Sequence, residues 1–286
     1  MEIRSVGICV KPEQPQLADL IRALEKWLVE RGIEVFPDPE SGRSTEAPGL
    51  ARGELAGRVE LVVVLGGDGT LLAVARALGP RDVPILGVNL GTLGFLAEIA
   101  REEIFPTLEA VFAGRFQIEE RMRLDVSVER DGLSLGRYLA LNDAVISNTA
   151  LSRLVHLETR ANGAAVTTYH ADGLIVATPT GSTAYSLSAG GPLVHPTMEA
   201  LLLTPISPHT LTHRPLVLPG ASEVEVRVSD ARGGRVHLTV DGQVGRELVE
   251  GDLVTVRRAA SPTRLLVDPA RTRFDALRAK LRWGER

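Results

Sequence analysis

The sequence predicts an α/β domain built on a parallel sheet, joined to a second domain that is mostly β-sheet. Strand-like and helix-like segments alternate from the amino terminus to about Phe112, the pattern of a parallel sheet covered by helices. After Gly114 the pattern changes to alternating polar and apolar residues, which is typical of half-buried strands. The last segment returns to an apolar run followed by a helix. We therefore assign residues 1–118 and 263–286 to the α/β domain and residues 119–262 to the β-rich domain.

Short apolar runs and amphipathic helices follow one another along the first domain. The runs are rich in β-branched residues and too short for a helix, which is typical of buried strands. The helical segments carry apolar residues on one face and end at Gly or Gly-Pro. One stretch is rich in Pro, Gly, Ser and Glu, and we expect it to be a mobile loop. We expect strands at 3–10, 33–36, 61–65 and 83–88, helices at 16–31, 70–78 and 101–112, and the loop at 37–50.

The β-rich domain is predicted from strands of period two and from the turn pairs between them. Asp131-Gly132 and Asn162-Gly163 stand between alternating runs, as in two-residue hairpin turns. Near the carboxyl terminus, an apolar run and an amphipathic helix indicate a tail that returns to the first domain. The strands are expected at 121–130, 138–147, 154–159, 166–169, 174–178, 224–228, 236–240 and 253–256, and the tail at 265–283.

Composition excludes several classes of partner and site. The 286 residues are 44% hydrophobic and 24% charged, with a formal net charge of −4. This mildly acidic balance argues against nucleic acid or an anionic membrane as the main partner. Cys9 is the only cysteine, so there is no internal disulfide and no cysteine-based zinc site. No signal peptide precedes the first strand and no apolar stretch approaches the roughly 20 residues of a membrane helix, so we expect a cytoplasmic protein.

A glycine-rich segment, Gly66-Gly67-Asp68-Gly69-Thr70, follows the buried strand at 61–65 and opens a helix. Glycine lets backbone N–H groups approach a phosphate closely, and a helix amino terminus favours negative charge. Asp68 is the one acid inside the loop, so we expect it beside the phosphate. The same residues also make Asp-Gly turns that only reverse the chain, and this alternative stays open on the segment alone.

Other familiar motifs are absent or incomplete. No glycine precedes Lys11, Lys26 or Lys280, the only lysines, which excludes a Walker A loop. No Gly-x-Gly-x-x-Gly occurs, so the usual dinucleotide fingerprint of redox enzymes is missing. His209 and His213 have helical metal spacing but are flanked by prolines, and we interpret them as structural.

Two segments of the second domain are candidates for ligand binding. Asn142-Asp143 stands at the end of a strand, where it can contact sugar hydroxyls or an adenine edge, or merely form a bend. The segment from Thr178 to Pro192 combines small hydroxyl residues and glycines with one aromatic residue, Tyr185. Small residues allow close approach of a ligand, Thr and Ser supply donors, and Tyr185 can stack on a base. A plain surface loop of this composition would usually lack the aromatic residue, which favours ligand binding.

Taken together, these motifs resemble those of the NAD kinase family. The resemblance spans nearly the whole chain in order, and its Thr-Pro-Thr-Gly-Ser-Thr-Ala-Tyr segment is much more specific than the first glycine loop. Diacylglycerol kinases, sphingosine kinases and phosphofructokinases carry loops similar to the first one. The matching segments are 66–70, 89–96, 141–143, 172–185, 188–192 and 207–216.

The resemblance implies a kinase that phosphorylates the adenosine-ribose 2′-hydroxyl of NAD. ATP or inorganic polyphosphate would be the donor, together with a divalent metal for which we expect Mg²⁺. Asp68 would accept the hydroxyl proton, and the donor phosphates would lie near Gly66, Gly67, Gly69 and Thr70. Family members commonly form homodimers or homotetramers through the β domain. The NAD-binding residues implied are Asp68, Gly69, Asn142, Asp143, Arg153, His170, Asp172, Thr183, Ala184, Tyr185, Ser186, Leu187, Ser188 and Gln243.

The resemblance also implies what these residues contact. Asn142 and Asp143 would hold the adenosine, and residues 183–188 would line the adenine pocket. Asp172 would contact the nicotinamide end, and His170 stands where many relatives have Arg. Two other functions stay open on the sequence. A lipid kinase would share the glycine loop, and a non-catalytic NAD-binding module would keep the aromatic segment without needing the acid of the loop.

Overall fold

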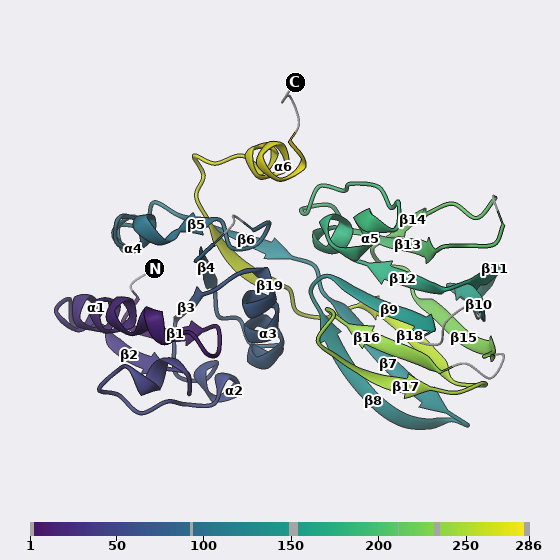
Figure 1. Cartoon of the computed structure of the whole chain (residues 1–286), viewed down its shortest axis with the longest axis horizontal. Coiled ribbons are helices and arrows are strands. Elements are labelled where there is room, and N and C mark those ends of the chain that lie inside the picture. The colour runs from purple at the N-terminus through teal and green to yellow at the C-terminus, as the bar shows by residue number, and fades with distance from the viewer. Residues whose placement is uncertain (1–2, 92–93, 149–153, 211, 232–234, 283–286) are drawn as a thin grey trace. The chain divides into compact units, whose positions relative to one another are not determined.

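The computed structural model describes residues 3–91, 94–148, 154–210, 212–231 and 235–282 (Figure 1). The chain forms two compact units, Met1–Glu120 with Thr263–Arg286, and Arg121–Pro262. The first is an α/β unit with a mostly parallel sheet, and the second is built from antiparallel strands. The predicted fold class is therefore confirmed. Within the described ranges, every helix is too short or too polar to cross a membrane.

One mostly parallel sheet organises the first unit. Its strands are β1 Ser5–Val10, β2 Glu34–Pro37, β3 Leu61–Leu65, β4 Ile85–Asn89, β5 Ile99–Ala100, β6 Gln117–Arg121 and β19 Thr263–Val267. Their order is β2-β1-β3-β4-β19-β6, and β5 adds to β4. The chain thus leaves β1 toward one edge and returns through β3 toward the other. The carboxyl ends of β1 and β3 form the switch point at which open parallel sheets bind ligands.

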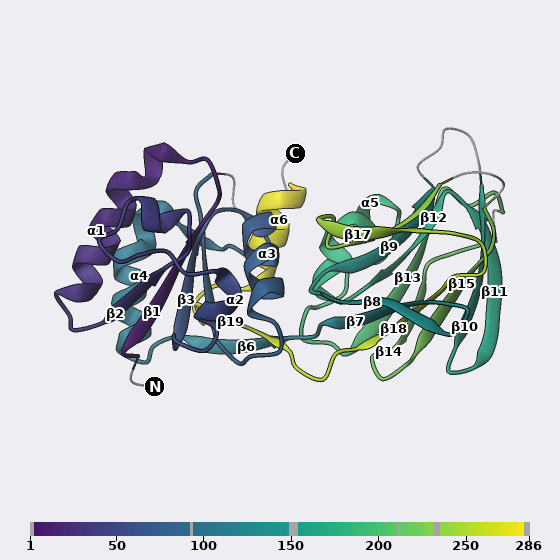
Figure 2. The same cartoon turned by 90° about the horizontal axis from the view of Figure 1, so that it is seen from below.

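Helices cover both faces of this sheet (Figure 2). They are α1 Ala18–Val29, α2 Arg52–Leu55, α3 Asp68–Leu78 and α4 Ile104–Phe112, with the 3-10 turns η1 Pro15–Leu17 and η3 Arg101–Glu103. On one face, Leu24 of α1 and Leu108 of α4 join Ile8 in a single buried cluster. On the other face, Gly7 lies against the Leu55 side chain of α2. Burial on both faces explains why the central strands β1, β3 and β4 are buried along their whole length, without alternation.

The segment that we expected to be a mobile loop is anchored by two buried carboxylates. Asp38 is fully buried and accepts hydrogen bonds from the Ser41 N–H and hydroxyl and from Arg52 Nε at 2.8 Å. Ser41 opens a further 3-10 turn, η2 Ser41–Arg43. Glu25 of α1 accepts a backbone N–H of the same segment at 3.0 Å. Composition alone predicted a mobile loop, because contacts with residues distant in the sequence, such as Glu25, cannot be recognised from the residue types within the segment.

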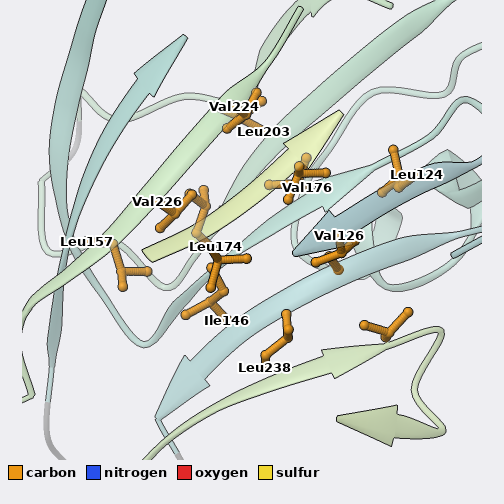
Figure 3. Packing of buried hydrophobic residues seen from close by; sticks show 14 of the residues in the cluster. Leu124, Val126, Ile146, Leu157, Leu174, Val176, Leu203, Val224, Val226 and Leu238 are labelled. Carbon is orange, nitrogen blue, oxygen red and sulfur yellow. The ribbon is translucent and has the colours of Figure 1, made fainter. Parts of the chain in front are cut away.

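Two antiparallel sheets of six strands each form the second unit. The first consists, in spatial order, of β11 Ala164–Ala171, β10 Val155–Ala161, β15 Val224–Asp230, β18 Leu253–Arg258, β7 Leu124–Arg130 and β8 Leu133–Ala140. The second consists of β14 Leu216–Pro219, β13 Ala200–Ile206, β12 Gly173–Ala177, β9 Asp143–Asn148, β16 Val236–Val240 and β17 Val244–Leu248. Val126 and Val226 of the first sheet share one core with Ile146, Leu174 and Leu238 of the second (Figure 3). The unit is a β-sandwich.

Two-residue turns connect neighbouring strands of the sandwich. The predicted hairpin turns Asp131-Gly132 and Asn162-Gly163 are confirmed, and all four residues have positive φ. A third hairpin, between β16 and β17, has a three-residue connection from Asp241 to Gln243 in which Asp241 and Gly242 have positive φ, and the sequence did not predict it. The strand predicted at 138–147 is wrong as a single strand. It is divided into β8 and β9, which belong to different sheets, by Leu141 and Asn142.

The carboxyl-terminal tail returns to the first unit, as predicted. Strand β19 pairs in parallel with β4, with Leu265 opposite Ile85, and α6 Arg273–Leu281 follows. The expectation that this helix is amphipathic is wrong for its described residues. Ala276 is the one buried residue among them, and Phe274 is 56% exposed. Ion pairs made by arginines hold this part of the tail instead.

Candidate active site

The glycine loop turns the chain from β3 into α3, so that Asp68 is the first residue of the helix. Gly66 continues the sheet by donating its N–H to the Val88 carbonyl at 2.9 Å. A side chain at Gly66 would collide with Thr70, whereas a Cβ at Gly67 would meet no described atom within 4 Å. The space in front of Gly67 is therefore open, as close approach of a phosphate requires.

The Asp68 carboxylate is held by three consecutive backbone N–H groups. Oδ2 accepts the N–H of Phe95 at 2.8 Å, and Oδ1 accepts those of Leu96 and Ala97, both at 3.0 Å. A side chain at Gly94 would overlap the carboxylate, so glycine is required there. We call residues 94–97 the amide cradle. A carboxylate has about four acceptor positions, so these bonds leave one position on Oδ2 for a further donor.

Lys11 follows β1 beside the glycine loop. Its N–H donates to the Leu65 carbonyl at 3.0 Å, which extends the β1–β3 pairing and sets Lys11 opposite Gly66. The side chain is exposed and forms no ion pair with any residue in the described part of the chain. The glycine loop has no cationic side chain of its own. Lys11 therefore adds a positive charge at the switch point of the sheet.

In the second unit, a carboxylate organises the start of β9 in the same way. Asp241, in the turn between β16 and β17, accepts the N–H groups of Leu141 at 3.1 Å, Asn142 at 2.8 Å and Asp143 at 3.3 Å. From the other side, Thr178 donates its N–H to the Asn142 carbonyl at 2.8 Å and its hydroxyl to that of Leu141 at 2.6 Å. Strands β12 and β16 flank β9 on either side. The segment 141–143 is thus fixed from both neighbouring strands.

A cavity of about 370 Å³ opens beside this segment. Volumes of this size are typical of small-molecule sites. Burial, and secondarily the nearby Asp241 charge, raise the pKa of Asp143 to about 7. Tyr185 is 47% exposed, so its ring is available to stack on a ligand. The cavity is lined by Asn142, Asp143, Val145, Ser147, Ala184, Tyr185, Thr239, Asp241 and Gly242.

The segment predicted to line an adenine pocket forms two short helical turns, η4 Thr180–Thr183 and α5 Tyr185–Ser188. Of its residues, Ala184 and Tyr185 line the cavity. The Ser186 side chain is buried, and its hydroxyl lies 2.9 Å from that of Thr204. The remaining predicted residues, Thr183, Leu187 and Ser188, lie on the same two turns outside the cavity lining.

The structure does not bring every predicted NAD-binding residue to this cavity. His170 is exposed on β11, with its ring centroid 4.1 Å from that of His156. Asp172 is exposed between β11 and β12, and Gln243 is exposed after the turn at Asp241. None of the three lines the cavity, and Arg153 lies outside the described residues.

Sequence reasoning missed the residues that act through backbone N–H groups. Asp241-Gly242 stands between two alternating strands and resembles an ordinary hairpin turn, so the local sequence does not indicate that its carboxylate binds backbone N–H groups. The amide cradle overlaps the family motif at 89–96, which contains two glycines. Its second glycine, Gly94, was the available signal, because glycine after a buried strand often marks a close approach.

Both units match models of the same family. The ATP-NAD kinase N-terminal domain matches residues 6–116, and the ATP-NAD kinase C-terminal domain matches residues 141–267. The chain belongs to the NAD kinase family. An NAD kinase of Geobacter sulfurreducens is 48% identical over 285 residues, covering 99% of this chain and all of the relative.

Solved structures of the family have the same fold. A crystal structure of yeast NADH kinase complexed with NADH matches with a TM-score of 0.89 and 28% identity, covering 100% of this chain and 89% of that one. An NAD kinase from Archaeoglobus fulgidus in complex with ATP matches with a TM-score of 0.75 and 26% identity, covering 97% and 98%. As a family member, this chain is a kinase that phosphorylates NAD to NADP. The lipid-kinase and non-catalytic alternatives are not supported.

Proposed function

We propose that this NAD kinase transfers a phosphoryl group to the adenosine-ribose 2′-hydroxyl of NAD, with Asp68 as the proton acceptor. The observation that carries the proposal is the amide cradle, which fixes both carboxylate oxygens and leaves one acceptor position on Oδ2. A fixed base is effective because no reorganisation is needed when the hydroxyl loses its proton. In a loose phosphoryl-transfer transition state the proton moves late, so positioning supplies most of the acceleration.

For the NAD adenosine, we assign the cavity of the second unit. Asn142 and Asp143 present polar side chains to it, and Tyr185 offers an exposed ring. The side chains of Asn142 and Asp143 can form hydrogen bonds with ribose hydroxyls and with the edge of an adenine, and the Tyr185 ring can stack on the adenine. The yeast NADH kinase structure, with NADH bound, supports a dinucleotide site in this fold. His170, Asp172, Gln243 and Arg153 remain predicted contacts of the nicotinamide end.

For the phosphate donor, we assign Gly66, Gly67, Gly69 and Thr70, and add Lys11. The open space at Gly67 and the position of the loop at the switch point support this assignment. A donor such as ATP carries several negative charges, which the glycine loop offsets only through N–H dipoles. Lys11 supplies a full positive charge opposite Gly66. The Archaeoglobus fulgidus NAD kinase was solved with ATP, which supports ATP as the donor here.

The family generally needs a divalent cation, and we propose Mg²⁺. In the described ranges no three His, Cys, Asp or Glu side chains come together as possible metal ligands. The residues therefore do not fit a metal site made of protein alone, and we assign no ligands. Mg²⁺ keeps several waters and binds substrate phosphates in many kinases, so it would arrive with the donor and offset its charge.

The division of labour between the two units is also part of the proposal. Residues 1–118 and 263–286 would hold the donor, and residues 119–262 would bind NAD and mediate assembly into a homodimer or homotetramer. A cytoplasmic location stays a prediction.

The activity is tested by incubating the protein with NAD, ATP and Mg²⁺ and assaying for NADP, with diacylglycerol as a competing acceptor. The donor assignment is tested with Gly67→Ala, because a Cβ there meets open space and leaves the fold unstrained. We expect the KM for ATP to rise at least about fivefold while the KM for NAD is unchanged. Gly53→Ala in α2, where a Cβ also fits, is the matched control and should change neither KM. An unchanged KM for ATP in Gly67→Ala would remove the loop from the donor site.

A further inference from the structure

The amide cradle continues directly into Glu98, which the carboxyl-terminal tail binds. Arg271 donates from Nη1 to the Glu98 carbonyl at 2.6 Å. Arg273 forms an ion pair with the Glu98 carboxylate. Glu98 is the residue after Ala97, whose N–H holds Asp68. The tail therefore binds both the backbone and the side chain of the residue next to the cradle.

The ion pair of Arg273 is mostly withdrawn from water. Its guanidinium lies between Glu98 and Glu119, and binds the Glu119 carboxylate at 2.7 Å. The three side chains are only 17%, 16% and 19% exposed, in the order Arg273, Glu98 and Glu119. Charged pairs that are this shielded keep a defined geometry, whereas fully exposed pairs contribute little. Arg273 thus ties the cradle to β6, at the far side of β19 in the sheet.

Arg271 reinforces the same connection one step further along the chain. Its guanidinium also forms an ion pair with Glu103, and the Glu103 carboxylate accepts the Ala100 N–H at 2.9 Å. Lys280 of α6 lies 5.9 Å from the centre of the Phe95 ring. Contacts from the tail thus reach Phe95, at one end of the set of N–H donors to Asp68. They also reach Glu98, and through Glu103 they reach Ala100, just beyond the other end of that set.

We propose that Arg271 and Arg273 are positioning residues that hold the amide cradle, and through it the Asp68 carboxylate, in the geometry for proton transfer. The inference rests on the proposed role of Asp68. The buried side chains of Leu96 and Ala97 hold part of the cradle, and the two arginines bind Glu98, the residue that follows it. A displacement of 1 Å in a reacting group can cost about a hundredfold in rate. Loosening the exit of the cradle should therefore lower turnover without touching either substrate site.

The test compares Arg273→Gln with Arg264→Gln. Arg264 lies in β19 of the same tail and binds Asp82 at 2.5 Å and Glu120 at 3.0 Å, away from the cradle. Both variants remove an arginine that bridges two acids, so both report general loosening of the tail. We expect Arg273→Gln to lower kcat about five- to thirtyfold, with KM for NAD and ATP within about threefold. Arg264→Gln should keep kcat within about twofold.

A second readout needs no substrate. Hydrogen exchange of the Phe95, Leu96 and Ala97 amides should speed up about tenfold or more in Arg273→Gln, and not in Arg264→Gln. Arg271→Gln should act in the same direction as Arg273→Gln, and provides an independent variant if the latter folds poorly. Equal effects of Arg264→Gln and Arg273→Gln on kcat would overturn the proposal. Unchanged exchange of the three amides in both Arg271→Gln and Arg273→Gln would also overturn it. A wild-type protein that makes no NADP would instead overturn the proposed function, and the exchange result would stand by itself.

Discussion

Each of the two units immobilises one aspartate with three consecutive backbone N–H groups. In the first unit Asp68 is held by residues 95–97, and in the second Asp241 is held by residues 141–143. The surroundings of the two carboxylates differ. Asp68 is half-buried with an open acceptor position and open space at Gly67, whereas Asp241 is only 7% exposed and lies close to a second carboxylate, Asp143.

Three consecutive N–H groups bound to one carboxylate serve a different purpose in each unit. Around Asp241 the hydrogen bonds fix the backbone from Leu141 to Asp143, so the carboxylate holds the segment that lines the cavity in place. Around Asp68 the hydrogen bonds fix the carboxylate, so the backbone holds the acid in place. Whether the carboxylate fixes the backbone or the backbone fixes the carboxylate depends on which of the two is packed more firmly. It also depends on how much space remains beside the carboxylate for a substrate.

Asp68→Asn should produce the largest change in activity. The amide can still accept from the cradle through one oxygen, but it cannot take a proton from a hydroxyl. We expect turnover to fall at least about a hundredfold while NAD affinity stays within a few-fold. Steady-state kinetics and calorimetric titration with NAD measure the two quantities. Equal losses in binding and turnover would show that Asp68 positions the substrate instead.

Asp241→Ala should affect stability most. It leaves the N–H groups of Leu141, Asn142 and Asp143 without this acceptor in a buried setting, at a cost of about 1–3 kcal/mol for each group that water cannot reach. We expect the free energy of unfolding to fall by about 2–4 kcal/mol in urea titrations. Asp68→Ala is the matched variant and should cost less, because water can reach the half-buried cradle. If the two variants destabilise the protein equally, the distinction between the two carboxylates fails.

Asp143→Ala tests whether the second unit holds NAD. Each hydrogen bond that a carboxylate accepts from a sugar hydroxyl contributes about 1.5–3 kcal/mol, so the KM for NAD should rise about ten- to a hundredfold. The KM for ATP should be nearly unchanged. Tyr185→Ala should behave likewise, through loss of about 1–3 kcal/mol of stacking. Varying each substrate in turn measures both constants. A higher KM for ATP with an unchanged KM for NAD would mean that the two pockets are assigned in reverse.

The raised pKa of Asp143 predicts a pH dependence of stability. Burial first, and the Asp241 charge second, raise this pKa to about 7, so the folded state binds the proton more tightly than the unfolded chain. The contribution is fully present below the ordinary pKa of Asp, near 4, and is lost as the pH rises through about 7. Unfolding free energies of wild type should therefore decline over this window relative to Asp143→Asn, by about 1–4 kcal/mol. Parallel pH profiles for the two proteins would contradict the assignment.

Lys11→Met should have the smallest effect. The side chain is exposed, and single exposed charges contribute about 0.2–1 kcal/mol. We expect the KM for ATP to rise about 1.5- to fivefold, and the rise to shrink at high salt because the interaction is screened. Lys26→Met on α1, where the lysine faces Glu30, is the control and should leave the KM for ATP unchanged. No difference between the two variants would remove Lys11 from the donor site.

The sequence was sufficient to predict elements and motifs whose signal is carried by local residue types. Apolar runs such as 61–65 predicted the strands of the parallel sheet, and the Asp-Gly and Asn-Gly pairs predicted two hairpins, because positive φ favours these residues. The glycine loop and Asn142-Asp143 could be predicted as candidate sites for the same reason. The signal lies in the residue types themselves, namely the polar side chains of Asn142 and Asp143 and the missing side chains of the glycines.

Contacts through the backbone could not be predicted, because every residue except proline carries the same N–H group. Nothing in the identity of Leu96 or Ala97 indicates that their N–H groups hold a carboxylate 28 and 29 residues earlier. The tail helix shows the same limit. The ion pair that holds it joins Arg273 to Glu98, which are 175 residues apart in the sequence. Two single charged residues so far apart form no repeating pattern from which their contact could be predicted.

The parallel pairing of β19 with β4 has a consequence for the order of events during synthesis. The second unit is a single stretch of chain, Arg121–Pro262, and is complete on the ribosome before β19 has been made. The first unit begins earlier in the chain, but it lacks one strand of its sheet until β19 has been made. It also lacks the two arginines that bind Glu98 until Arg271 and Arg273 have followed. Domains usually fold as units in order of their emergence. Here the amino-terminal unit matures last, and a chain cut short before Thr263 would leave the ribosome with a finished sandwich and an edge of β4 exposed to pairing with other chains.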